Sequence, residues 1–314
     1  MTKTVLKLGT DCSGIEAPLF ALKNIQKKNK NLEIQHVFSS DVDPYVKQIH
    51  KDNFSAEINF DDITQREKSK IPYVDIYVAG FPCQPFSKAN KFRSEDDKRK
   101  QVFFGCLDVI TQHSPKIVIF ENVKTLLSHE GGSTYSRIMK ELHDLNKYDI
   151  YAKVLNTKNH GIPQARDRLY IVCILRSEKK KDFEFPPHCP MKSLKSMLDP
   201  KSYPVEPIKE KNQPLFSRIP KGSVFVDIGF RNASFPNSDK WAPCITAQAN
   251  MWNVKKQRRA TVHEYLKLQG FPTDFFVQKV SDHRFKKIIG NAMTVNVVEA
   301  ILRQALPCIN IKCK

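Results

Sequence analysis

The chain has 314 residues, of which 40% are hydrophobic, and its 51 lysines and arginines against 33 aspartates and glutamates give a formal net charge of +18. This length suffices for one large domain, or for a large and a small one, and 20 phenylalanines with regular apolar periodicity argue against disorder. No run approaches the ~20 apolar residues of a membrane span, and residues 1–3 lead directly into a strand-like segment, so we expect neither a membrane protein nor a secreted one.

The positive charge is concentrated in one part of the chain. Residues 176–259 contain 17 basic and 8 acidic residues, a net charge of +9 on about a quarter of the sequence. A lysine-rich surface can serve solubility alone, but a localised one favours binding to a polyanion such as nucleic acid. The eight cysteines include no C-x-x-C pair, which indicates reduced thiols in an intracellular protein and no metal site.

Strand-like and helical patterns alternate along the first 176 residues. Short apolar runs predict strands, and apolar residues at helical spacing predict helices between them. The predicted strands are 5–9, 34–39, 74–80, 116–121 and 169–175, and the predicted helices are 17–30, 98–111 and 136–146. This alternation is typical of an α/β domain, with a mostly parallel sheet covered by helices on both faces, and we place it at residues 1–180.

The composition changes after residue 181. Ten of the 19 prolines lie between residues 186 and 243, and proline at this density excludes long helices and central strands. We therefore expect a small irregular domain over residues 181–270. A capping box at 261–264, followed by Gly270, predicts one helix near its end. A last helix at about 292–304 lies in a segment, 271–314, that returns to the first domain.

Three segments carry side chains suited to chemistry. Cys83 follows the predicted strand 74–80, at the carboxyl edge where parallel α/β sheets build their sites, although a buried structural thiol is the commonest fate of a free cysteine. Glu121 ends another predicted strand and would emerge at the same edge. Arg166 and Arg168 precede a further strand and would bring two guanidinium groups nearby, unless they form an ordinary ion pair with Asp167.

The order of these segments resembles the DNA (cytosine-5) methyltransferase family. F-P-C-Q-P-F-S at 81–87, E-N-V at 121–123, Q-x-R-x-R at 164–168, a variable basic stretch and G-N at 290–291 follow one another as they do in that family. The resemblance covers nearly the whole chain outside residues 181–250. It implies a Rossmann-like fold of the class I S-adenosylmethionine-dependent methyltransferases, and methyl transfer to carbon 5 of cytosine in a short duplex DNA site.

The resemblance also implies a role for each catalytic side chain. Cys83 would add to carbon 6 of a flipped-out cytosine, because a thiolate is nucleophilic and able to leave again. Glu121 would present a protonated carboxyl group to ring nitrogen 3, while Arg166 and Arg168 would orient the base and that carboxyl group. The sequence does not identify the group that removes the carbon 5 proton.

The family's positions for the cofactor, S-adenosyl-L-methionine, are only partly matched. The F-x-G-x-G loop of the family corresponds to C-S-G-I-E at 12–16, which has Cys12 for the aromatic residue and Glu16 for the second glycine. Both departures predict altered detail or affinity in cofactor binding. By resemblance, Asp41 would bind the ribose hydroxyls. The residues implied around the cofactor are Gly14, Ile15, Asp41, Val42, Asp62, Ile63, Pro82, Asn291 and Ala292.

Residues 181–257 occupy the place of the family's target-recognition domain. The candidates for contact with the substrate base or DNA are Gln84, Ser87, Asn122, Arg231 and Thr246. Lys240, Asn250 and Trp252 are weaker candidates, because surface exposure or packing explains them as well. The resemblance implies double-stranded DNA as the partner and no membrane or metal. We expect a monomer inside a prokaryotic cell or in a DNA-containing compartment of a host cell, with a restriction endonuclease of the same site as a potential partner.

Two other functions compete with DNA methylation. The tRNA-directed branch of the family typically has P-P-C-Q and a C-F-T triplet, whereas this chain has F-P-C-Q and no C-F-T. A catalytically silent DNA-binding regulatory relative is suggested by Cys12 and Glu16. Against it, Cys83, Glu121 and both arginines are present, and no binding module needs that set.

Overall fold

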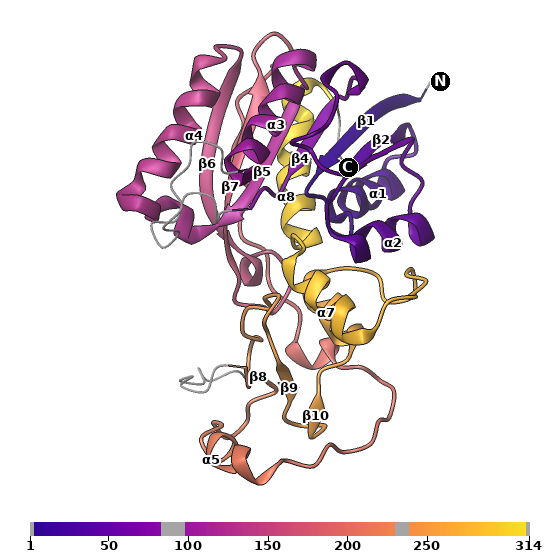
Figure 1. Cartoon of the computed structure of the whole chain (residues 1–314), viewed down its shortest axis with the longest axis vertical. Coiled ribbons are helices and arrows are strands. Elements are labelled where there is room, and N and C mark those ends of the chain that lie inside the picture. Colours follow the sequence, from indigo (N-terminus) through magenta and orange to yellow (C-terminus); the bar gives the residue numbers. More distant parts are fainter. Residues whose placement is uncertain (1–2, 83–97, 230–238, 312–314) are drawn as a thin grey trace.

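The computed structural model describes residues 3–82, 98–229 and 239–311. Its upper part is a seven-stranded sheet (Figure 1) with the strand order β3-β2-β1-β4-β5-β7-β6. Neighbouring strands are parallel, except that β7 runs antiparallel to both β5 and β6. The strands are β1 (Thr4–Asp11), β2 (Leu32–Ser40), β3 (Ile58–Phe60), β4 (Ile76–Ala79), β5 (Ile117–Val123), β6 (Tyr148–Asn156) and β7 (Asp167–Leu175).

Helices cover both faces of this sheet. One apolar core packs α1 and α8 against the first face, and a second core packs α3 and α4 against the other. Along β5, Ile117 and Ile119 belong to the first core and Val118 and Phe120 to the second, as the alternation of side chains along a strand requires. The helices are α1 (Ala17–Lys28), α2 (Pro44–Asn53), α3 (Lys98–His113), α4 (Ser133–Asp144) and α8 (Val295–Ala305).

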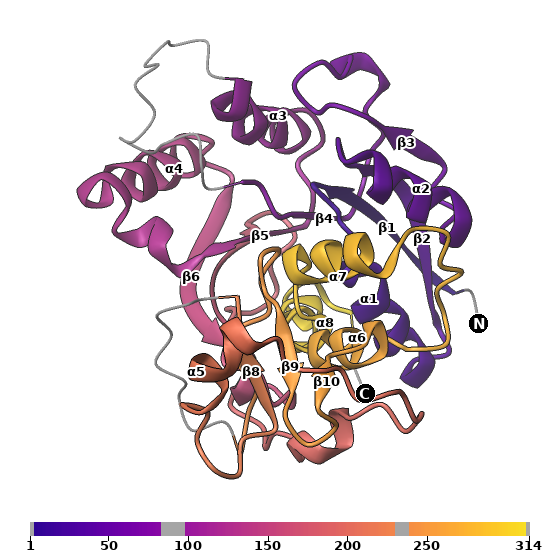
Figure 2. The same cartoon turned by 60° about the horizontal axis from the view of Figure 1, so that its bottom comes forward.

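The proline-rich segment forms a smaller region below the large sheet (Figure 1), built on an antiparallel sheet in the order β10-β9-β8. In both views, α7 lies between the two sheets (Figure 2). Phe225 and Met251 of the small sheet belong to the same apolar core as α1 and α8, so the two regions share one core. The elements are α5 (Gln213–Phe216), β8 (Phe225–Asp227), β9 (Met251–Asn253), β10 (Arg258–Arg259), α6 (Val262–Gln269) and α7 (Asp282–Asn291).

Single turns of 3-10 helix connect many of these elements. They lie at Lys68–Lys70, Lys124–Leu127, His129–Gly132, Thr157–Asn159, Leu194–Met197, Glu210–Asn212 and Leu306–Ile309. Every strand and helix predicted for the first 176 residues is present, with bounds shifted by a few residues. The mostly parallel α/β fold is therefore confirmed.

Eight elements were not predicted from the sequence: β3, β6, α2 and α7, together with α5, β8, β9 and β10 of the small region. β3 has only three residues, and β6 is an outermost strand whose residues are mostly half-buried, so neither shows an apolar run. The signal for α2 lies in its first turn, where the Asp43 carboxylate accepts from Tyr45 N at 2.8 Å and Pro44 occupies the first helical position.

The predicted capping box before α6 is confirmed. Thr261 N donates to Glu264 Oε2 at 2.9 Å, and Glu264 N donates to Thr261 Oγ1 at 3.3 Å. Gly270 ends the helix with a φ of 81°, in the left-handed region that glycine adopts most easily. The last helix begins at Val295 rather than 292, because Ala292 and Thr294 have extended backbone.

One helical stretch, Asp282–Ile309, is long and apolar enough by composition to cross a membrane. It comprises α7, α8 and a final 3-10 turn, with extended backbone at Ala292 and Thr294 between the two helices. The protein buries 67% of its most apolar window, as expected for core helices. Among the described residues, six cysteines are free, and no group of three or more His, Cys, Asp or Glu residues is placed to hold a metal ion.

Candidate active site

The chain leaves the edge of the large sheet just before the predicted nucleophile. β4 ends at Ala79, and at the end of the neighbouring β5 the side chain of Asn122 donates to the carbonyl oxygen of Phe81 at 3.0 Å. This hydrogen bond fixes the backbone one residue before Pro82, the last described residue of the segment. Three predicted site residues of the segment that follows, Cys83, Gln84 and Ser87, lie outside the described residues.

Glu121 is buried at this edge with one carboxylate oxygen unsatisfied. Arg168 Nε lies 3.1 Å from Glu121 Oε1, but the two groups are not aligned for a hydrogen bond, and this oxygen has no hydrogen-bond donor within the described part of the chain. Burial raises the pKa of Glu121 above its ordinary value, against the opposing effect of Arg168 and Arg166. A side chain at Gly80 would clash with Met293 and contact Glu121 Oε2, so glycine keeps this space open.

The antiparallel pairing of β5 and β7 brings Arg168 to Glu121. Tyr170 lies opposite Glu121 and Arg168 lies opposite Val123, so the two charged residues are diagonal neighbours. The carboxylate of Asp167 instead accepts from Asn156 Nδ2 at 2.7 Å. The alternative of an ordinary ion pair between Arg168 and Asp167 is therefore not what the structure contains.

Arg166 is almost fully buried, at 2% exposure, and contacts backbone rather than Glu121. Its guanidinium group donates to the carbonyl oxygens of Ile245 at 2.5 Å, Gly290 at 3.1 Å and Ala292 at 2.9 Å. Ile245 lies between β8 and β9 of the small region, and the other two carbonyls belong to the G-N segment before α8. Arg166 therefore holds together the segments on either side of the site.

Glutamines that the sequence analysis did not single out reinforce this junction. Gln164 accepts from Ile245 N at 2.9 Å and donates to Leu268 O at 2.6 Å. Gln269 donates to Ala292 O at 3.1 Å and accepts from Thr294 Oγ1 at 2.9 Å. Gln164 belongs to the Q-x-R-x-R motif, but the partners of these side chains lie up to 105 positions away, which no local pattern reveals.

The loop at residues 12–16, which the sequence predicts to bind the cofactor, turns sharply after β1. Cys12, Gly14 and Glu16 all have positive φ, at 49°, 54° and 61°, and a Cβ atom built on Gly14 would have no neighbour within 4 Å. Gly14 N donates to Asp41 Oδ2 at 3.0 Å, which joins the loop to the end of β2. Burial raises the pKa of Asp41. The next residue, Val42, is 63% exposed, whereas Ile15 is fully buried in the core.

Glu16, which replaces the second glycine of the family pattern, is fully buried beneath this loop. Its carboxylate accepts from Thr10 Oγ1 at 2.9 and 3.1 Å and from Ser39 Oγ at 2.6 Å. His50 lies 3.8 Å from the carboxylate and approaches Gly14 O at 2.6 Å. Glu16 therefore supports the loop through these hydrogen bonds, although it departs from the family pattern.

A buried ion pair supports the neighbouring loop, which carries Asp62 and Ile63. Asp62 Oδ1 accepts from Thr64 N at 2.9 Å, and the Ile63 side chain packs where a Cβ on Gly105 would clash. Arg66 then donates to both oxygens of Asp11, at 2.8 and 2.9 Å. This fixes the loop to the end of β1.

The G-N segment lies at the same edge. Asn291 is exposed and Ala292 is 5% exposed, while Met293 lies over Gly80. Among the DNA candidates, Lys240 is exposed and Thr246 is half-buried. Trp252 packs its ring edge against Phe216, with centroids 5.0 Å apart, Asn250 N donates to Asp227, and Arg231 lies outside the described residues.

Comparison with known proteins identifies the class to which this fold and site belong. The family described as C-5 cytosine-specific DNA methylase matches residues 12–306. The chain belongs to this family, which confirms the resemblance drawn from the motifs. It is a DNA (cytosine-5-)-methyltransferase that uses S-adenosylmethionine, and its family reacts through a covalent adduct with the base.

Curated relatives and solved structures agree with this assignment. The type II methyltransferase M.HaeII of Haemophilus aegyptius is 36% identical over 286 residues, covering 88% of this chain and 87% of the relative. M.NgoBI of Neisseria gonorrhoeae is 35% identical over 277 residues and 84% of each chain. The crystal structure of the S. pombe Dnmt2 methyltransferase has the same fold, with a TM-score of 0.71 at 17% identity over 98% of this chain and 100% of that one.

Proposed function

We propose that this chain methylates carbon 5 of a flipped-out cytosine in a short duplex DNA site, with Cys83 as nucleophile and Glu121 as the acid at ring nitrogen 3. The observation that carries this proposal is the unsatisfied oxygen of Glu121, buried where the chain departs toward Cys83. A raised pKa favours the protonated carboxyl group, which can donate to the unprotonated ring nitrogen as no carboxylate could.

The proposed reaction follows from these two groups. The Cys83 thiolate adds to carbon 6, and as negative charge develops on the ring, the Glu121 proton moves to nitrogen 3. Carbon 5 then has enamine character and forms its bond to the methyl group, whose bond to the donor's sulfonium sulfur would break and leave its electron pair on that sulfur. Loss of the carbon 5 proton to a base expels Cys83, and nitrogen 3 returns its proton to Glu121.

Two arginines would support this step in different ways. Arg168, 3.1 Å from Glu121, would orient the carboxyl group and stabilise charge at the cytosine oxygen. Arg166 has its guanidinium committed to three backbone carbonyls, so we assign it to positioning the cytosine site. Asn122 would act similarly, by holding the Phe81 carbonyl.

The residues at the ends of β1 and β2 fit S-adenosylmethionine, which supplies an electrophilic methyl group when bound. The open space above Gly14, the Asp41 carboxylate and the exposed Val42 side chain form a cradle suited to a nucleoside. Asp41 would accept from the ribose hydroxyls, and the loop holding Asp62 and Ile63 would contact the adenine. Gly14, Ile15, Pro82, Asn291 and Ala292 would complete the site near the methionine portion.

The basic small region would hold the DNA. Thr246, beside the segment fixed by Arg166, is our candidate for contact with the phosphate of the flipped nucleotide, and Arg231 for contact nearby. Replacing four exposed lysines of residues 176–259 by glutamine should weaken DNA binding and lower its salt dependence by about one unit of slope per lost phosphate contact, while cofactor affinity is unchanged.

We further propose that the protein acts as a monomer. It would act in the cytoplasm of a prokaryote or in a DNA-containing compartment of a host cell. A restriction endonuclease of the same site is proposed as its functional partner, because M.HaeII and M.NgoBI are type II methyltransferases.

One experiment tests the function. Purified protein with labelled methyl donor and duplex DNA of mixed sequence should yield 5-methylcytosine, and sequencing of DNA from expressing cells should give the recognition site. Cys83→Ser should abolish the product, so full activity in that variant would refute the mechanism. A parallel assay on tRNA and calorimetry with S-adenosylmethionine test the two competing functions: product on tRNA alone, or no cofactor binding, would overturn the proposal.

A further inference from the structure

His50 is a buried histidine that the proposed reaction does not use. It lies in α2, is 6% exposed, and its ring packs edge-on against Phe54, with the ring centroids 5.5 Å apart. Its Nε2 atom lies 2.6 Å from the carbonyl oxygen of Gly14, and its Nδ1 atom lies 3.2 Å from Ser39 Oγ. Both ring nitrogens therefore make polar contacts at the cofactor loop, residues 12–16, and its support.

These contacts belong to a relay of three hydrogen bonds. Ser39 Oγ lies 2.6 Å from Glu16 Oε1, so the relay runs from Glu16 through Ser39 and His50 to the carbonyl oxygen of Gly14. Glu16 is 0% exposed and Ser39 is 1% exposed. The hydrogens of the relay must therefore come from these groups themselves rather than from bulk water.

The relay needs three hydrogens, one for each contact. The Gly14 carbonyl only accepts, so His50 Nε2 must carry the first hydrogen. The Ser39 hydroxyl supplies the second, which points either to Glu16 or to His50. If Glu16 is a carboxylate and His50 a neutral imidazole, neither of them supplies the third, and one of the two contacts of Ser39 has no hydrogen.

The third hydrogen has two positions available to it. It lies on His50 Nδ1 when the ring is doubly protonated and Glu16 is a carboxylate, and it lies on Glu16 when that group is protonated and Ser39 donates to Nδ1. The two forms interconvert when Nδ1 passes its hydrogen to Ser39 Oγ and Ser39 passes its own to Glu16, so the pair titrates as one unit. Burial raises the pKa of Glu16, against the opposing effects of His50 and of the hydroxyl groups bonded to the carboxylate.

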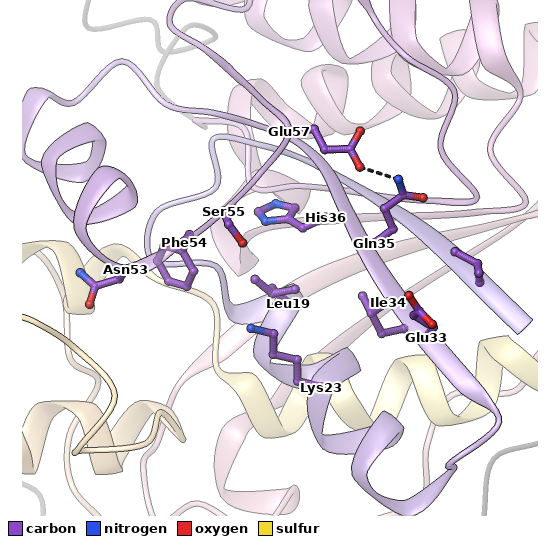
Figure 3. A pocket seen from close by; sticks show the side chains of 11 residues that line it. Leu19, Lys23, Glu33, Ile34, Gln35, His36, Asn53, Phe54, Ser55 and Glu57 are labelled. Carbon is purple, nitrogen blue, oxygen red and sulfur yellow. Dashed lines mark hydrogen bonds between the residues drawn. The ribbon is translucent and has the colours of Figure 1, made fainter. Parts of the chain in front are cut away.

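Two titratable groups beside the relay have other contacts. His36, on β2, lies 3.6 Å from Glu16 Oε2 and lines a cavity of about 560 Å³ between α1 and β2 (Figure 3). Burial, together with the charge of Lys23 on α1, lowers the pKa of His36 to about 4, so this ring is neutral above pH 5. Asp41, after β2, accepts from Gly14 N at 3.0 Å, and burial raises its pKa.

The charged and titratable groups of the other surrounding segments also lie outside the relay. In the loop, burial raises the pKa of the Cys12 thiol, which keeps it uncharged. On α2 and the segment before α7, the charged groups form ion pairs, Lys47 with Asp61 at 2.9 Å and Asp52 with Lys279 at 2.7 Å. Titration of these groups removes no hydrogen from the relay.

We propose that His50 is a positioning residue of the cofactor loop, which shares one proton with Glu16 through Ser39. With this proton, all three hydrogen bonds form and the Gly14 carbonyl is held, so the loop keeps the left-handed conformation of Gly14 in which its N–H reaches Asp41. Without the proton, one contact of the relay has no hydrogen and the loop is held less firmly.

Cofactor affinity is therefore highest while the pair of Glu16 and His50 holds its shared proton, and it falls as the pH rises and the proton is lost. By linkage, a bound cofactor favours the protonated pair by the same factor. This inference rests on the proposed cofactor site at residues 12–16.

Calorimetry on the full chain tests the shared proton, with S-adenosylhomocysteine as the probe. It is titrated between pH 6 and pH 9 into the unmodified protein and into Glu16→Gln, whose amide donates to Ser39 and so supplies the third hydrogen without titrating. Loss of one hydrogen bond changes affinity about fivefold. We expect the unmodified protein to lose about fivefold more affinity than the variant as the pH rises. The ionisation of the probe and of Asp41 affects both proteins alike and cancels in this comparison.

Two further variants assign the effect to His50. His50→Phe removes the donor to Gly14 and should weaken binding about tenfold, without the additional pH dependence. His36→Gln is the matched control, because His36 is buried beside the same carboxylate but lies outside the relay, so this variant should keep the additional pH dependence. If His36→Gln loses it and His50→Phe keeps it, the proposal is overturned.

NMR on unmodified protein with labelled imidazole nitrogens gives a test that does not depend on the folding of a variant. We expect Nε2 of His50 to carry a hydrogen at pH 7, and the Nδ1 signal to titrate with the same midpoint as the affinity. The proposal is overturned if Nε2 lacks the hydrogen, or if the pH dependence of the unmodified protein equals that of Glu16→Gln. Binding without this difference leaves the proposed function standing, whereas no binding at any pH overturns both.

Discussion

Two buried carboxylates of the large sheet, Asp11 at the end of β1 and Glu121 in β5, differ in their hydrogen bonding. At the β1 end, the Asp11 carboxylate accepts from Arg66 at both oxygens, from Tyr77 Oη at 2.6 Å and from Ser40 Oγ at 2.6 Å. At the β5 end, Glu121 has an oxygen with no hydrogen-bond donor among the described residues, although it is buried as well.

This difference separates a structural group from a reactive one. Both oxygens of the Asp11 carboxylate accept hydrogen bonds, and this keeps Asp11 charged. Asp11 is therefore a structural anchor, because its loss would leave buried donors unpaired. Glu121 is held in place by β5 and faced by Arg168, but its hydrogen bonding is incomplete. Burial raises the pKa of Glu121 against the effect of Arg168 and Arg166, which favours the protonated carboxyl group that a substrate would need.

The largest effect is expected for Glu121→Gln, which tests the reactive end. The amide has the same shape but cannot transfer a proton to nitrogen 3, so the rate of methyl transfer should fall by about 10²–10⁴-fold. Single-turnover assays on DNA measure this rate. Because no hydrogen bond between the carboxylate and a described residue is lost, the thermal unfolding temperature should be unchanged or slightly raised at pH 7. A variant that methylates at the unmodified rate would remove Glu121 from the mechanism.

The same variant has a pH signature. A carboxyl group whose pKa is raised in the native state gives stability at pH values below its unfolded pKa, about 4.3 for Glu, and loses it as the pH rises through the native value. The Glu121→Gln variant has no carboxyl group at this position, so it does not lose stability in this way as the pH rises. The stability of the variant relative to the unmodified protein should therefore increase from pH 4 to pH 7 in denaturant titrations, and a constant difference would contradict the raised pKa.

Arg66→Met tests the structural end, where we expect a loss of stability without a direct effect on proton transfer. Removing one partner leaves the Asp11 charge buried and uncompensated, which costs about 3–5 kcal/mol. Adding Asp11→Asn to Arg66→Met should recover part of this loss, because the amide carries no charge, and its single oxygen can still accept from either Tyr77 or Ser40, which donate to different oxygens of Asp11. Denaturant unfolding of the single and double variants measures the coupling. If the double variant is no more stable than Arg66→Met, the ion pair of Arg66 and Asp11 does not anchor the end of β1.

The sequence was sufficient to predict most of the sheet and its class, because buried parallel strands such as β4 and β5 are short unbroken apolar runs. It also placed Glu121 at the sheet edge, since a strand-final acid is a local feature. The antiparallel direction of β7 was not predicted. That direction is what aligns Arg168 with Glu121.

The roles of Arg166 and Glu16 could not be predicted from local sequence. Arg166 stands in the same short motif as Arg168, yet its partners are three carbonyls 79 to 126 positions away. Glu16 departs from the family pattern and predicted altered detail or affinity in cofactor binding, but its hydrogen bonds from Thr10 and Ser39, on two different strands, could not be predicted. Both roles depend on tertiary partners that the motif spacing does not encode.

Glu16 offers an intermediate case, because it is well bonded like Asp11 but supports the cofactor loop. Glu16→Ala removes the carboxylate that accepts from the Thr10 and Ser39 hydroxyls, at a cost of about 1–3 kcal/mol, and should weaken S-adenosylmethionine binding about tenfold. Glu16→Gln keeps two acceptor lone pairs and should bind within about threefold of the unmodified protein. Calorimetry measures both. The rate at saturating cofactor should be unchanged, so a fall in that rate alone would contradict a positioning role.

The smallest effect is expected at Thr261, beside a third buried carboxylate. Glu264 accepts from Arg258 at 2.9 and 3.1 Å and from Asn253 at 2.7 Å, so this carboxylate, in the small region, is even better satisfied than Glu16. Thr261→Ala removes only the cap of α6 and its hydroxyl contact with Asp199. The expected loss is about 1 kcal/mol, measured by thermal unfolding, and Thr261→Ser should restore it.

A well-satisfied carboxylate should tolerate the loss of one neighbour that does not neutralise its charge. The backbone N–H of Thr261 still reaches Glu264 in the alanine variant, and Arg258 still balances the charge. Thr261→Ala should therefore leave the methylation rate and the DNA affinity unchanged. A loss of several kcal/mol of unfolding free energy would mean that the Glu264 cluster depends on every one of its members. The number of hydrogen bonds to a buried carboxylate would then not distinguish structural carboxylates from the reactive Glu121.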